Sequence, residues 1–245
     1  MTASAIIQVP AVLFLATIIR SAFGFGEALI AVPLLALVLP VEVAAPIAVL
    51  VSITVAAVVV AQDWREIHIG SAGWLVFSTM FGIPVGLLIL KTIPEAIVKT
   101  VLAVVIVAFS AYSLIRRHRA RLHNDRLAWL FGFGAGILGG AYGMNGPPLV
   151  VYGAMRGWSP ANFRATLQGY FLPASLVGMC GYWIAGLWTP VVTRYYLISL
   201  APALIAIFVG RMINRRLDSR RFLYVIHIGL IAIGALLLIQ ALPKT

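Results

Sequence analysis

The chain has 245 residues, of which 62% are hydrophobic and 10% are charged, and its formal net charge is +11. Soluble domains carry about 25% charged residues, so this composition excludes a soluble globular domain and indicates a protein that crosses the membrane several times. The basic residues stand in short segments between apolar runs, where they orient a membrane protein, so we expect no nucleic-acid partner. The single cysteine, Cys180, excludes an intramolecular disulfide and a cysteine metal cluster.

The first half of the chain begins with an apolar run over residues 4–23. No Lys or Arg precedes this run and no small-residue cleavage site follows it, so we expect a retained segment and not a signal peptide. A glycine-rich break comes next, and the following run, residues 28–39, is too short to span, because a crossing needs about 20 residues. We interpret it as a half-helix or as the return arm of a hairpin. Three full spans are then predicted, over residues 40–60, 70–90 and 96–115.

The second half follows a strongly basic linker, residues 116–126, close to the midpoint of the chain. A second break lies in Gly143-Met-Asn-Gly-Pro-Pro148, where glycines and two prolines prevent a smooth helix. Short apolar runs flank this break, over residues 127–138 and 149–155. Three long spans are predicted after it, over residues 159–184, 191–210 and 222–242.

The two halves can be laid on each other, with the Gly26 break on the Gly143 break and Pro40 on Pro160. We therefore predict one all-α polytopic membrane domain, residues 1–245, built from two repeats at about 1–118 and 124–245. Each repeat has a Gly/Pro-broken helix or hairpin and three long transmembrane helices. Inverted repeats place the basic loops 116–126 and 211–221 together on the cytoplasmic side, as the positive-inside rule requires, so we favour inversion.

Broken helices at corresponding places in two halves are typical of the binding site of a transporter. Half-helix ends present unpaired N–H groups and a positive dipole to an anion. The candidate substrate-binding residues at the breaks are Gly24, Gly26, Gly143, Asn145 and Gly146. The other interpretation is helix packing, which we favour for Gly132 and Gly136, because with Gly140 they form a ridge of small residues four apart.

Arg20 is the first charged candidate, because near the tip of a hairpin it lies deep in the membrane, where a cation costs at least about 2.5 to 3.5 kcal/mol. If the first segment simply crosses, a snorkelling side chain is the better interpretation. Glu27 has three open roles: a partner of Arg20, the proton-coupling group, or a carboxylate at a half-helix N-terminus. Arg164 and Gln168 share a helical face four residues apart. They are candidates for an anion vestibule, although Arg164 is more typical of an interfacial anchor.

The two breaks carry a family resemblance. Phe23-Gly-Phe-Gly-Glu-Ala-Leu-Ile-Ala-Val-Pro-Leu34 and Gly139-Gly-Ala-Tyr-Gly-Met-Asn-Gly-Pro-Pro-Leu149 resemble the motifs of the TauE/SafE family of sulfite and organosulfonate exporters, also called the toluene sulfonate uptake permease group. This resemblance implies a bacterial inner-membrane carrier of small, often sulfur-containing anions, with the proton gradient as its energy source. Glu27 stands where a small residue is usual in the family.

The sequence thus predicts a secondary transporter of small anions, with sulfite or organosulfonates as the substrates that the resemblance implies. Its expected partners are the anion and the lipid bilayer, and the same interpretation allows a homo-oligomer. We expect no enzyme, no cofactor and no metal site, because the chain has no His-Glu-x-x-His helix and no P-loop. Two alternatives stay open: an anion channel with the same breaks, and a non-transporting assembly or anchoring protein that uses its glycines for packing.

Overall fold

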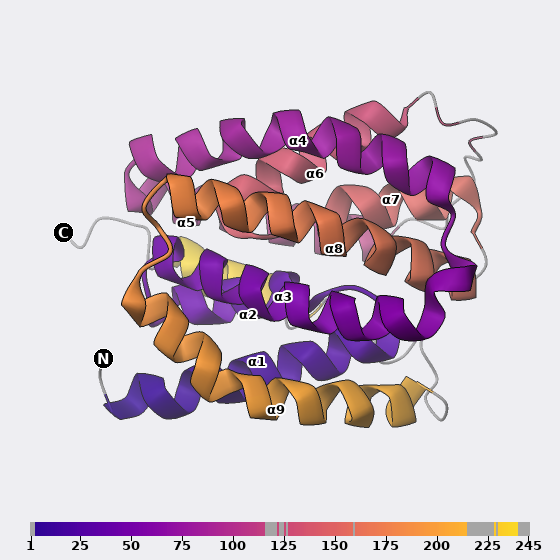
Figure 1. The fold of residues 1–245 in the computed structure, drawn as a ribbon. Coiled ribbons are helices and arrows are strands. Elements are labelled where there is room, and N and C mark those ends of the chain that lie inside the picture. The colour runs from indigo at the N-terminus through magenta and orange to yellow at the C-terminus, as the bar shows by residue number, and fades with distance from the viewer. Residues whose placement is uncertain are drawn as a thin grey trace.

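The computed structural model describes residues 3–115, 122, 125, 127–158, 160–214, 228 and 230–239. This part of the chain contains helices and no strand, as predicted. Its elements are α1 (Ala3–Phe23), α2 (Glu27–Ala36), α3 (Val41–Asp63), the 3-10 turn η1 (Trp64–Glu66), α4 (Ile69–Thr92), α5 (Glu95–Ile115), α6 (Ala128–Tyr142), α7 (Gly146–Arg156), α8 (Pro160–Ile184), α9 (Pro190–Asn214) and the helix Leu230–Ile239. They run roughly side by side in one bundle (Figure 1).

Five of these helices, α1, α3, α4, α5 and α9, are long and apolar enough to cross a membrane. Their outer faces carry large apolar side chains. On α4, for example, Trp74, Phe77 and Phe81 are 58%, 56% and 61% exposed. A contiguous exposed apolar surface of this kind requires a nonpolar surrounding. The chain is therefore a multi-pass membrane protein.

Both predicted breaks are present, and both depend on glycine. Gly24 and Gly26, between α1 and α2, have φ angles of 84° and 100°, and Gly143, at the end of α6, has a φ of 65°. These left-handed conformations are unfavourable for residues with a Cβ. The second break is shorter than predicted, because Pro147 lies in the first turn of α7, where its missing N–H has no helical partner to lose.

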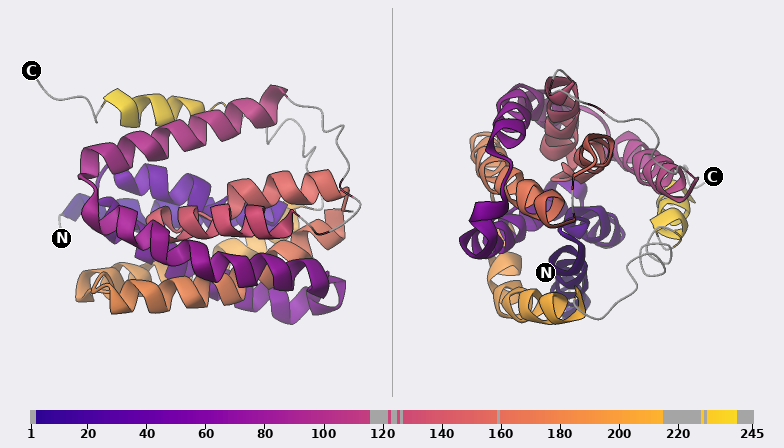
Figure 2. Two further views of the ribbon diagram at one scale, coloured as in Figure 1. Left: turned by 90° about the horizontal axis from the view of Figure 1, so that it is seen from above. Right: turned by 90° about the vertical axis from the view of Figure 1, so that its right-hand side faces the viewer.

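The α6–α7 segment is a hairpin and not a single crossing. The Leu122 N–H, ahead of α6, donates to the Met155 carbonyl near the end of α7 at 2.7 Å, and Asp125 is 3.4 Å from Arg156. The start of α6 and the end of α7 are therefore neighbours. In the bundle, α1 begins at the left-hand end and α7 ends toward the right-hand end (Figures 1 and 2). The inverted relation of the two halves remains a prediction.

The helix that precedes each break, α1 or α6, packs closely against a helix from the other half of the chain. On α6, a Cβ added to Gly136 would lie 2.4 Å from the Thr79 carbonyl oxygen of α4, and one on Gly132 would lie 2.4 Å from the Leu75 carbonyl oxygen. On α9, a Cβ on Gly210 would lie 2.5 Å from the Ile18 carbonyl oxygen of α1. Gly132 and Gly136 thus have the packing role, because only glycine allows these backbones to approach so closely.

Helix α3 holds the two halves together at the centre. It packs against α2, α8 and α9, and Ala44, Ile47, Ala48 and Val51 on it are fully buried. The second break rests on the same helix, since a Cβ on Gly143 would lie 3.0 Å from the Ala45 carbonyl oxygen. Helix α3 therefore contacts both broken segments, at α2 in the first half and at Gly143 in the second.

The α4–α6 contact gives a matched pair of glycine substitutions. Gly136→Ala should destabilise the protein by about 1 to 3 kcal/mol, because the added methyl overpacks a backbone contact. Gly134→Ala is the control, since nothing lies within 4 Å of a Cβ there, and alanine favours the helix. Thermal unfolding in detergent measures both. Equal melting temperatures for the two variants would contradict the close contact.

Candidate functional site

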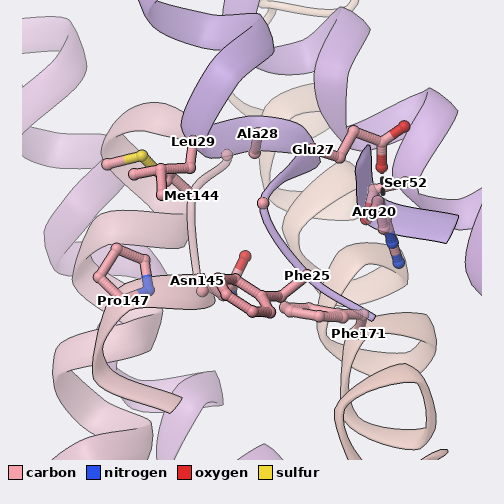
Figure 3. A pocket seen from close by; sticks show the side chains of 13 residues that line it. Arg20, Phe25, Glu27, Ala28, Leu29, Ser52, Met144, Asn145, Pro147 and Phe171 are labelled. Carbon is pink, nitrogen blue, oxygen red and sulfur yellow. Dashed lines mark hydrogen bonds and ion pairs between the residues drawn. The ribbon is translucent and has the colours of Figure 1, made fainter. Parts of the chain in front are cut away.

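The two breaks meet around one small cavity (Figure 3). Three residues from long helices complete its wall, Arg20 of α1, Ser52 of α3 and Phe171 of α8. The break residues that line it are Phe25, Gly26, Glu27, Ala28, Leu29, Gly143, Met144, Asn145, Gly146 and Pro147. The cavity volume is about 20 Å³, and one water needs about 10 to 15 Å³. A larger ligand therefore requires the two breaks to move apart.

Arg20 is the centre of the polar network beside the cavity. Its side chain is 3% exposed, and its guanidinium donates four hydrogen bonds. Nε and Nη2 donate to Gln168 Oε1 at 3.3 and 2.8 Å, while Nη1 donates to Ser52 Oγ at 2.7 Å and to the Glu27 carboxylate. The guanidinium also lies over the Phe171 ring, 4.9 Å from its centroid. Because an arginine has five N–H donors, nearly all of its hydrogen-bonding capacity is used inside the protein.

Glu27 neutralises two positive features at the same time. Its buried carboxylate forms an ion pair with Arg20 and accepts a hydrogen bond from Thr17 Oγ1 at 2.9 Å. It is also the first residue of α2, so its negative charge faces the positive end of that helix dipole. Two of the three roles left open by the sequence, partner of Arg20 and helix N-terminal carboxylate, are therefore combined in one side chain.

Gln168 joins the first break to the second half of the chain. Its Oε1 accepts from Arg20, and its Nε2 donates to the Gly24 carbonyl oxygen at 2.7 Å. Arg164, one turn earlier on α8, packs across the break, since a Cβ on Gly24 would lie 2.9 Å from Arg164 Cγ. Gly24, Arg164 and Gln168 are not among the residues that line the cavity. Arg164 packs against the first break, and Gln168 is connected to the cavity through Arg20.

Asn145 is fixed by a second hydrogen-bonded chain behind the cavity. Its Nδ2 donates to Tyr170 Oη at 3.2 Å, and Tyr170 Oη lies 2.6 Å from Thr79 Oγ1. The Asn145 side chain packs on Gly139, where a Cβ would lie 2.4 Å from Nδ2. The amide therefore cannot move without disturbing α4, α6 and α8.

The helix N-terminus at the second break has few N–H donors. Pro147 and Pro148 remove two of the first N–H groups of α7, which leaves the Asn145 amide as the main polar group on that side. The positive charge of the site therefore comes from the first break, at Arg20 and the start of α2.

Five polar residues of this network were not among the predicted site residues: Thr17, Ser52, Thr79, Tyr170 and Ser175. Ser52 and Ser175 are 3.1 Å apart although they are 123 residues apart in the chain. A Ser or Thr hydroxyl in an apolar helix is common, because it can bond to the carbonyl of its own preceding turn. No local pattern distinguishes Thr17, Ser52 and Thr79, whereas Tyr170 and Ser175 follow Gln168 along the same predicted span.

The family assignment agrees with this geometry. A family model described as Sulfite exporter TauE/SafE matches residues 9–237. The chain belongs to the sulfite exporter TauE/SafE family. Membership implies membrane transport of anions of the sulfite and organosulfonate type. No curated protein and no solved structure matches the chain. In this TauE/SafE member, the glycine breaks that carried the resemblance are the ones that line the cavity.

The buried ion pair can be tested by a double-mutant cycle. Arg20→Gln and Glu27→Gln should each lower the free energy of unfolding by about 3 to 5 kcal/mol, because each leaves one buried charge unpaired. The double variant should lose less than the sum of the two, since it removes both charges. Chemical denaturation in detergent measures the three values.

The surface pair Lys99–Glu95, with side chains 20% and 52% exposed and N and O atoms 3.1 Å apart, is the matched control for this cycle. Lys99→Gln and Glu95→Gln should each change the free energy of unfolding by no more than about 1 kcal/mol. Additive losses in the Arg20 and Glu27 cycle would show that the two side chains are not coupled.

Proposed function

We propose that this TauE/SafE protein is a secondary transporter that carries sulfite or an organosulfonate together with a proton, by alternating access. The observation that supports this most directly is the pairing of Glu27 with Arg20 beside the cavity. A substrate anion and the Glu27 carboxylate need the same positive partners. Binding of the anion is therefore favoured when Glu27 is protonated.

Protonation of Glu27 has two effects in this proposal. It neutralises the carboxylate that pairs with the Arg20 guanidinium. The same loss of charge leaves the positive end of the α2 dipole without a negative partner. Both positive features then act on an anion in the cavity, where little water competes. The anion and the proton consequently move in the same direction.

Access to the cavity is proposed to change by movement of the two broken segments, α1–α2 and α6–α7. The closed cavity has room for about one water, so loading requires separation of Gly26 from Gly143. Helix α1 packs against α9, and α6 packs against α4, through the glycine contacts described above. Each broken segment therefore moves with a long helix as one body, and sliding of these bodies over α3 alternately exposes the two sides of the site.

We further propose that residues 1–245 form one transport domain of two inverted repeats, at about 1–118 and 124–245, in a bacterial inner membrane. The packing supports this: α1 and α6, the first helices of the halves, each contact the long α9 or α4 of the other half. In this arrangement the basic loops are cytoplasmic. Most residues of loops 116–126 and 211–221 lie outside the described part of the chain.

Transport into proteoliposomes tests the proposed function. With an acidic exterior, the wild-type protein should accumulate radiolabelled sulfite with a saturable rate. Glu27→Gln should lose accumulation driven by the pH gradient, because glutamine has no carboxyl group that can bind and release a proton. The same variant should keep sulfite exchange between the two sides of the membrane. Glu42→Gln, which changes an exposed carboxylate in the first turn of α3, is the control and should behave like the wild type.

Each other outcome has a distinct meaning. Accumulation by Glu27→Gln at the wild-type level would remove Glu27 from proton coupling. A flux that never saturates and never runs uphill would identify an anion channel. Absence of flux for sulfite and several sulfonates, in a protein that is folded, would favour an assembly or anchoring role.

Cysteine labelling tests the inverted topology. Cys180→Ser removes the native thiol, and single cysteines are then placed in loops 116–126 and 211–221. A membrane-impermeant maleimide should label both positions only from the cytoplasmic side, because inverted repeats bring both basic loops to that side. Labelling from opposite sides would contradict the inversion.

A further inference from the structure

The hydrogen bonds among Thr79, Tyr170 and Asn145, behind the cavity, have a fixed donor-to-acceptor direction. Thr79 Oγ1 donates its one proton to the Gly132 carbonyl oxygen, at 2.7 Å. Thr79 must then accept in its 2.6 Å contact with Tyr170 Oη, so the Tyr170 hydroxyl donates its proton there. A hydroxyl has one proton. Tyr170 Oη is left as an acceptor, and its neighbour Asn145 has to present an N–H to it.

This chain fixes which end of the Asn145 amide faces the cavity. The nitrogen donates to Tyr170 Oη at 3.2 Å, and the amide as a whole packs on Gly139. The carbonyl oxygen points into the space between the two breaks (Figure 3). Asn145 is 7% exposed and lines the cavity. Its oxygen therefore contacts a ligand that enters the cavity. An acceptor is an unusual group to aim at an anion, because sulfite and alkyl sulfonates are surrounded by acceptor oxygens of their own.

Resting on the proposed function, we infer that Tyr170 and Thr79 are positioning residues that hold the Asn145 oxygen toward the substrate, and that the site therefore selects anions that carry their own hydrogen-bond donor. Hydrogen sulfite and hydroxy- or amino-substituted sulfonates belong to this class. Arg20 binds the anionic oxygens of such a ligand, while Asn145 accepts from its O–H or N–H. An anion without a donor leaves the buried Asn145 oxygen unsatisfied and repelled.

The geometry of this chain does not depend on the closed state of the cavity. Thr79, Tyr170 and Gly132 belong to α4, α8 and α6, which pack against one another. Their mutual contacts lie behind Asn145 and do not include Arg20 or Glu27. The orientation of the amide is therefore maintained when the first break moves away to admit a ligand.

Two sulfonates of equal charge and equal heavy-atom number provide the probe. Hydroxymethanesulfonate has a hydroxyl where ethanesulfonate has a methyl group. We expect the wild-type protein to bind hydroxymethanesulfonate about tenfold or more tightly than ethanesulfonate, because only the former satisfies the Asn145 oxygen. Isothermal titration calorimetry of the detergent-purified protein at one acidic pH measures both dissociation constants.

Two conservative variants change the orientation of the amide without touching the cavity wall. Tyr170→Phe removes the acceptor for Nδ2, and Thr79→Val removes the acceptor for the Tyr170 proton, which then turns toward Asn145. In both variants the amide can present its N–H groups to the ligand, so the ratio of the two dissociation constants should fall toward one. Ser78→Ala is the control, because its hydroxyl donates within α4 to the Trp74 and Leu75 carbonyls, and it should keep the wild-type ratio.

Thermal unfolding in detergent first establishes that both variants are folded, because a general loss of folding would weaken both ligands equally and leave this ratio unchanged. An unchanged ratio in folded Tyr170→Phe and folded Thr79→Val would overturn the positioning role. Equal affinity of the wild type for the two sulfonates would overturn the selection for a donor while leaving the proposed function intact. Failure of the folded wild type to bind sulfite or either sulfonate would instead overturn the proposed function, and this inference with it.

Discussion

The buried Arg20–Glu27 ion pair is the interaction on which the rest of the site depends. The two residues are seven apart in sequence, and on a continuous helix they would be separated by about 10 Å along the axis. The three-residue break between α1 and α2, with two glycines at positive φ, folds the chain so that they meet directly. The partners of the pair, Gln168, Ser52 and Thr17, come from α8, α3 and α1. The break, the charge pair and the packing around it therefore form one unit.

Charge neutrality connects this pair to transport. A single charge without a partner in a low-dielectric interior is costly. The empty site is neutral because Glu27 balances Arg20. In the proposed loaded state, a proton on Glu27 and a monovalent anion beside Arg20 keep the site neutral. The state with a deprotonated Glu27 and a bound anion has a net negative charge and is disfavoured. In the proposed mechanism, the same physical cost that pairs the two residues would prevent the anion from crossing without its proton.

Sequence patterns were sufficient to locate the breaks and several site residues, but not the contacts between distant helices. Glycine and proline act on the local backbone, so the breaks at Gly24–Gly26 and at Gly143 could be predicted from the sequence. A buried charge is rare in an apolar segment, so Arg20 and Glu27 were also recognisable. The hydroxyls of Ser52 and Thr79 were not recognised, because a Ser or Thr hydroxyl in an apolar helix has no local signature. Their roles depend on helix pairs that meet only in the folded bundle.

The glycine contact between α1 and α9 has a consequence for biogenesis. Helix α1 is synthesised before α9, yet its close approach at Gly210 involves the last part of α9. Similarly, the close backbone contact of α4 with Gly132 and Gly136 forms only after α6 has been synthesised. The α1–α2 segment with its buried arginine is therefore synthesised well before the helix that packs closely on it. Because Glu27 follows Arg20 by only seven residues, the partner of the arginine charge is supplied by the same segment and does not depend on any later helix.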